Sequence, residues 1–100
     1  MLTINTEENG SEITVILEGK VDTGTAPELS KELDPLMESH DKIILDLKDV
    51  LYVSSAGLRV FLATDQTMKN NEKTAQFKNV PGPVMDIFEM TGFSNVLNFI

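Results

Sequence analysis

Two adjacent hydroxyl side chains, Ser54 and Ser55, form the part of this sequence best suited to chemistry. They lie in the stretch YVSSAGLR (residues 52–59), between an apolar run and the start of a predicted helix. A serine hydroxyl at such a place can cap a helix, accept a phosphoryl group or act as a nucleophile. Capping requires only one serine, so the second hydroxyl needs a separate explanation.

The nucleophile interpretation is weakly supported by the flanking residues. The tripeptide SAG at residues 55–57 matches the second half of the G-x-S-x-G elbow of α/β-hydrolases, but Val53 replaces the first glycine. A serine nucleophile also needs a nearby base. The only histidine, His40, is predicted on the surface at the end of an earlier helix, beside its last carbonyl groups. A small serine hydrolase or nucleotide-handling enzyme using Ser55 is therefore the alternative function.

Other catalytic chemistries have no motif of their own. Asp46 lies near the end of a predicted strand and Asp49 follows it, but they do not form the cluster of carboxylates that a hard cation prefers. The glycines at positions 19, 24 and 57 lack the spacing of a phosphate-binding loop. The absence of cysteine excludes a thiolate metal site. We therefore expect no metal, no cofactor and no enzymatic activity.

The overall composition limits the kinds of partner that the protein can bind. The 100 residues are 41% hydrophobic, which suits a single domain over residues 1–100 with one core. A formal net charge of −8 opposes binding to nucleic acid or to an anionic membrane surface, because both require a basic footprint. The N-terminus lacks the basic and apolar regions of a signal peptide. We therefore expect a cytoplasmic protein that binds another protein or a neutral small molecule.

The first half of the chain predicts a hairpin followed by a helix and a strand. Two strand-like runs, residues 2–6 and 13–17, flank Asn9-Gly10, a strong hairpin turn signal. A helix over residues 25–40 is predicted to begin with a capping box between Thr25 and Glu28. Residues 42–47 then read as a buried central strand.

The second half repeats this alternation. Residues 56–70 predict a helix, residues 75–80 a strand, and the segment after Pro83 a last helix that ends at Gly92. Residues 96–100 are predicted to close the chain as an edge strand, and the methionines at positions 68, 85 and 90 to fill the core. The expected fold is α/β, with a mixed sheet of four to five strands, an N-terminal hairpin and flanking helices.

Three segments together resemble a STAS domain of the anti-sigma factor antagonist type. They are LEGKVDTGTAPEL (residues 17–29), ILDLKDVLYVSSAGLRVFL (residues 44–62) and FEMTGFSNVLNFI (residues 88–100). The resemblance implies a protein that binds a serine-kinase anti-sigma factor and so releases the sigma factor. It further implies that this kinase switches the protein off by phosphorylating one serine, and that a serine phosphatase resets it.

The resemblance also implies which residues act. Matching the family pattern places the phosphorylated serine at Ser55. Many relatives carry Asp immediately before it, whereas this chain has Ser54, so Ser54 is the alternative. The loop after the second strand should lie beside the serine junction, because both follow neighbouring strand ends. The predicted partner-binding residues are Asp22, Thr23, Thr25, Ser54, Ser55, Ala56, Gly57, Leu58 and Arg59.

Overall fold

The computed structural model describes all 100 residues as a mixed sheet with helices on one face. The elements are β1 (Leu2–Asn9), β2 (Glu12–Val21), α1 (Ala26–Ser39), β3 (Lys42–Val53), α2 (Ser55–Asn70), β4 (Thr74–Lys78), α3 (Gly82–Thr91) and a 3-10 turn (Phe93–Asn95). The strand order is β1-β2-β3-β4, with an antiparallel β1–β2 hairpin and parallel β2–β3 and β3–β4 pairs. The α/β class, the mixed sheet and the N-terminal hairpin are confirmed.

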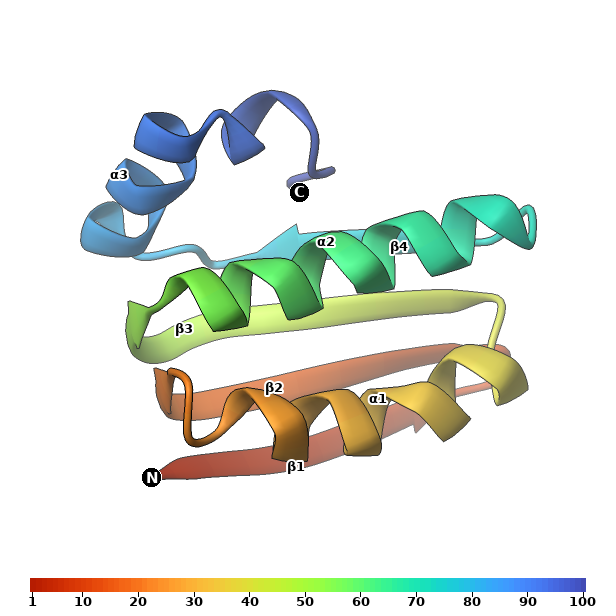
Figure 1. Cartoon of the computed structure of the whole chain (residues 1–100). Helices are drawn as coiled ribbons and strands as arrows, with labels where there is room; N and C mark the ends of the chain where they lie inside the picture. The colour runs from red at the N-terminus through yellow and green to blue at the C-terminus, as the bar shows by residue number, and fades with distance from the viewer.

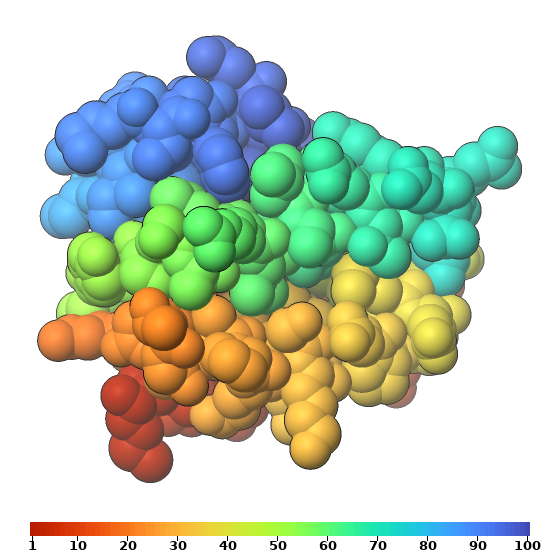
Figure 2. Space-filling model, in the orientation of Figure 1, coloured from red at the N-terminus to blue at the C-terminus, as the bar shows by residue number.

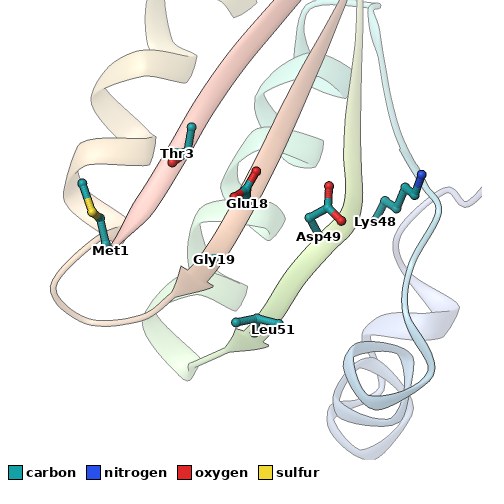
Figure 3. A pocket seen from close by; sticks show the side chains of 7 residues that line it. All are labelled: Met1, Thr3, Glu18, Gly19, Lys48, Asp49 and Leu51. Carbon is teal, nitrogen blue, oxygen red and sulfur yellow. The ribbon is translucent and has the colours of Figure 1, made fainter.

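The two faces of the sheet differ because its strands alternate apolar and polar residues. On one face of the central strands every second residue is buried: Ile13, Val15 and Leu17 on β2, and Ile43, Leu45 and Leu47 on β3. They face α1 and α2, which run side by side in Figure 1 and whose side chains meet in the space-filling view of Figure 2. No helix covers the opposite face, which is seen in Figure 3 with the strands in front of the helices. None of the helices has the length and apolar character needed to cross a membrane.

An aromatic cluster joins the C-terminal part of the chain to this core. The ring of Phe61 on α2 lies 5.3 Å from that of Phe77 on β4 and 6.2 Å from that of Phe88 on α3, both edge to face. The ring of Phe99 lies 5.7 Å from that of Phe88. Such pairs stabilise beyond the area that they bury. They hold α3 and the chain end against the β4 side of the sheet.

Two predictions for the C-terminal region are wrong. Residues 96–100 form only a single bridge, between Phe99 and Phe77, because the preceding 3-10 turn leaves too little extended chain for a strand. Met90 does not fill the core, since its side chain is 82% exposed on the outer side of α3. Met68 and Met85 do contact the core, and Gly92 ends α3 with a left-handed backbone (φ 82°) as predicted.

His40 is the third departure from the sequence prediction. It is only 5% exposed, and its Nε2 lies 2.6 Å from Oε1 of Glu8. Its Nδ1 lies 3.0 Å from the carbonyl oxygen of Leu36, so it does reach a late helix carbonyl as expected. The carboxylate comes from the end of β1, 32 residues away in the sequence, so no local pattern announces it.

β3 continues well beyond its predicted end at residue 47, and its pairing register with β2 shifts at two places. Glu18 pairs with Asp49 and Gly19 with Val50, but Lys20 pairs with Tyr52, so Leu51 is an extra residue in β3. A bulge of this kind bends the strand and redirects its side chains. As a result Val50 and Val53 point into the core, whereas Leu51 and Tyr52 are 70% and 47% exposed.

The first turn of α2 packs directly on the carboxyl ends of β2 and β3. A Cβ atom at Gly57 would lie 2.7 Å from the carbonyl oxygen of Val21 and 3.0 Å from a methyl group of Val53. Real side chains do not tolerate such a separation from a backbone oxygen, so only glycine fits. Gly57 therefore allows the helix to begin against the sheet, which fixes the position of the two serines.

Gly57→Ala is expected to lower the free energy of unfolding by about 1–3 kcal/mol, because overpacking against Val21 outweighs alanine's better helix propensity. Gly82→Ala is the matched control, because Gly82 is also in the first turn of a helix and its added Cβ would meet no atom. Chemical denaturation of the three proteins measures both. A Gly57→Ala variant as stable as the control would contradict the close packing.

Candidate functional site

The candidate site lies where β2 and β3 end side by side. Val21 and Val53 are paired across the two strands, and the backbone N–H of Ser54 donates to the carbonyl of Val21 at 2.8 Å. This bond ties the start of α2 to the end of β2. The loop from β2 to α1 leaves from the same point, so the two segments predicted to bind a partner emerge together at one end of the molecule (Figure 1).

The two serines have different structural roles. Ser54 is the N-cap of α2, and its Oγ accepts a hydrogen bond from the N–H of Gly57 at 3.3 Å. Ser55 is the first helical residue, is exposed, and makes no side-chain hydrogen bond within the protein. One hydroxyl therefore serves the fold, and the other stands free at a helix N-terminus, where backbone N–H groups and the helix dipole favour an anion.

This division of roles predicts unequal effects of removing the hydroxyls. Ser54→Ala should cost about 1 kcal/mol through loss of the cap, which corresponds to a melting temperature lower by roughly 4–8 °C for a domain of this size. Ser55→Ala should change stability by less than about 0.5 kcal/mol, as surface substitutions do. Thermal melts of both variants test this. Equal losses, or a larger loss for Ser55→Ala, would show that Ser55 contributes to the cap.

Asp22 organises the neighbouring loop. Its Oδ1 accepts hydrogen bonds from the backbone N–H groups of Gly24 and Thr25, each at 3.0 Å, and from the Thr25 hydroxyl at 3.2 Å. The N–H of Thr25 is the main cause that lowers the pKa of the Asp22 carboxyl, followed by the Thr25 hydroxyl and the N–H of Gly24. Each of these donors favours the ionised form. The Asp22 carboxylate thus holds the loop closed.

The predicted capping box at the start of α1 is wrong. Thr25 occupies the N-cap position, but its side chain makes no capping hydrogen bond. Its hydroxyl instead lies 2.8 Å from the carbonyl oxygen of Lys20 and accepts from the N–H of Asp22 at 2.9 Å. The hydroxyl is therefore occupied within the loop, and Pro27 at the start of the helix removes one N–H that would need a cap.

The lowered pKa of Asp22 gives the loop a defined pH dependence. Its contribution to stability is fully present above the ordinary carboxyl pKa of about 4, and is lost as the pH falls through the lowered folded-state value. Asp22→Asn keeps an acceptor of the same shape but no titratable group. The difference in melting temperature between wild type and Asp22→Asn should therefore shrink as the pH falls from 6 toward 3. A difference that does not change with pH would contradict this role.

The other predicted residues divide by exposure. Thr23, Ser55 and Arg59 are exposed, and Asp22, Ser54 and Ala56 are half-buried. The side chains of Thr25 and Leu58 are buried, as is Gly57. The three ion pairs of the structure are formed by other residues, so the Arg59 guanidinium has no carboxylate partner within 4 Å. The exposed side chains at the site are thus the Ser55 hydroxyl, the Arg59 guanidinium and the Thr23 side chain.

Two exposed apolar residues beside the site were missed from the sequence. Leu51 and Tyr52 precede Ser54 by three and two residues and point to solvent. In the sequence they belong to the apolar run that leads into the serines, since the bulge that turns them outward depends on pairing with β2. After Leu47 the sequence stops alternating strictly between apolar and polar residues, and this break is the one sequence signal that could have indicated the bulge.

The geometry does not support a catalytic serine. His40 lies at the far end of α1, and a 14-residue helix separates the two ends by about 20 Å at 1.5 Å per residue. Both its ring nitrogens face other groups, Glu8 and Leu36. The site instead presents the exposed hydroxyl of Ser55 at the N-terminus of α2. Such a position suits modification and protein contact better than nucleophilic attack.

Comparison with known proteins agrees with this geometry. The family model described as "Mlab, STAS domain" matches residues 4–98. This chain belongs to the STAS domain family. The anti-sigma-B factor antagonist of Bacillus subtilis (strain 168) is 29% identical over 97 residues, which cover 97% of this chain and 89% of that protein.

Solved structures of STAS proteins share the fold. An anti-sigma factor antagonist from Mycobacterium paratuberculosis has a TM-score of 0.89 at 23% identity, covering 99% of this chain and 85% of that one. The Bacillus cell fate determinant SpoIIAA in its phosphorylated form has a TM-score of 0.77 at 12% identity, covering 98% and 91%. At these identities the likeness establishes the fold alone.

Proposed function

We propose that this STAS protein is an anti-sigma factor antagonist controlled by phosphorylation of Ser55. In this function it binds a serine-kinase anti-sigma factor in the cytoplasm, which frees the sigma factor, and phosphorylation by that kinase ends the binding until a serine phosphatase removes the phosphate. The observation that supports the proposal most directly is the free, exposed hydroxyl of Ser55 beside a neighbour, Ser54, that already provides the helix cap.

The position of Ser55 should let phosphorylation change partner binding without unfolding the domain. A phosphoserine adds about −1.5 to −2 charges at pH 7. At the first residue of α2 this charge meets the free N–H groups of the helix N-terminus, so the domain itself should tolerate it. A partner docked over the same residue would have to desolvate the dianion, which is unfavourable by several kcal/mol in order of magnitude. A loss of about 2.7 kcal/mol already weakens binding roughly a hundredfold.

The surroundings of Ser55 supply a small mixed surface for such a partner. Thr23 and Arg59 lie exposed near it, and Tyr52 adds an amphipathic ring that is 47% exposed. Exposed Tyr and Arg are typical of the residues that dominate binding at protein interfaces. An unpaired Arg59 in a chain of net charge −8 is also available to an acidic group of the partner.

Charge mimicry tests the proposed switch. Ser55→Asp should weaken binding to the cognate serine-kinase anti-sigma factor by tenfold or more while changing the melting temperature by only a few degrees, because Asp is accepted near a helix N-terminus. Ser55→Ala should bind like wild type and resist the kinase. Calorimetric titration of each variant with purified anti-sigma factors from the same organism measures the affinities.

Ser11→Asp is the matched control, because Ser11 is also exposed but lies in the hairpin turn at the other end of the sheet. It should bind like wild type. Phosphopeptide mapping after reaction with the kinase identifies the modified residue directly. Tight binding by Ser55→Asp, or phosphate found only on Ser54, would overturn the proposal.

A further inference from the structure

Arg59 follows Ser55 by about one turn of α2. Both side chains are exposed, and residues four positions apart are neighbours on the same face of a helix. Side chains of an α-helix lean toward its N-terminus. The long side chain of Arg59 can therefore reach back to the first turn, where Ser55 is the first helical residue.

Arg59 has no acidic partner in the unmodified protein. It is the only arginine of the chain, and none of the three ion pairs includes it. The residues three and four positions away on the helix are Ser55, Ala56, Leu62 and Ala63. Of these four, only the serine can acquire a negative charge, and it does so by phosphorylation.

A phosphate on Ser55 has the right position and chemistry for this arginine. An ion pair at this spacing is more favourable when the acidic residue precedes the basic one. The planar guanidinium offers two parallel N–H groups to phosphate oxygens, and such charge-assisted hydrogen bonds are roughly twice as strong as neutral ones. The pair would form on the helix surface without moving any residue of the core.

We propose that Arg59 binds the phosphate of phosphorylated Ser55 as an ion pair along α2. Phosphorylation then changes the surface in two ways, because it adds negative charge and it engages the one arginine that the unmodified protein leaves free for a partner. The presence of the phosphate rests on the proposed function. The pairing itself depends only on the spacing of the two residues on the helix and on the lack of another partner for Arg59.

Protein with genetically encoded phosphoserine at position 55 tests the pair without a kinase or an anti-sigma factor. Melting temperatures are compared for wild type and Arg59→Gln, each with serine or with phosphoserine at that position. Relative to the serine forms, phosphoserine should raise the melting temperature by about 2–4 °C more in wild type than in Arg59→Gln. Arg59→Lys should lie between them, because it keeps the charge but loses the two parallel N–H groups.

The ³¹P NMR signal of the phosphoserine reports the contact itself. A cation beside the phosphate favours its dianionic form. The signal should therefore titrate at a lower pH in wild type than in Arg59→Gln. An arginine that only supported the helix would change the melting temperature of all forms equally and would leave this titration unchanged.

The double variant Arg59→Gln/Ala63→Arg is the matched control. It keeps the net charge of the chain but moves the arginine to position 63, which is also exposed on α2. That position is eight residues from Ser55, or about 12 Å along the helix axis. In both measurements the double variant should behave like Arg59→Gln.

Two results would overturn the inference. They are an equal response of wild type and Arg59→Gln to phosphoserine, and a double variant that behaves like wild type, which would show a long-range charge effect instead of a contact. Neither result bears on the proposed function, which is tested by the binding of Ser55→Asp to the anti-sigma factor.

Discussion

The structure depends on one close approach, in which the first turn of α2 rests on the carbonyl end of β2. Gly57 permits it, because any side chain at that position would collide with the carbonyl oxygen of Val21. The same carbonyl accepts a hydrogen bond from the N–H of Ser54. A single backbone group therefore fixes where α2 begins and how closely its first turn approaches the sheet. The position of the two serines at the end of β2 and β3 follows from this contact.

The polar groups that stabilise this region of the fold are different from the hydroxyl that is free to be modified. The hydroxyl of Ser54, the carboxylate of Asp22 and the hydroxyl of Thr25 all have hydrogen-bond partners within the protein. Ser55 has none, although it lies directly beside them. A modification at Ser55 therefore adds charge to a rigid surface and removes no interaction from the fold. Its effect would be felt by a docked partner, which is the property that a switch based on partner exchange requires.

The sequence predicted the parts of this account that depend on local patterns. Hydrophobic alternation and the turn residues located the strands and helices, and the pair of serines before Gly57 located the site. Features set by contacts between distant segments were not predictable. The carboxylate that pairs with His40 comes from Glu8 at the end of β1, and the bulge that exposes Leu51 arises from the pairing of β3 with β2. The capping box failed because the Thr25 hydroxyl oxygen accepts from the backbone N–H of Asp22 and so faces the loop.

The most direct test of the central claim compares the unmodified protein with the enzymatically phosphorylated one. ¹⁵N NMR spectra of the two forms report where the structure responds, and a titration with the anti-sigma factor reports the change in affinity. We expect shifts confined to the first turn of α2 and residues 22–25, an unchanged core, and affinity weakened roughly a hundredfold. Shifts spread through the core, or a phosphorylated protein that binds its partner as tightly as before, would contradict it.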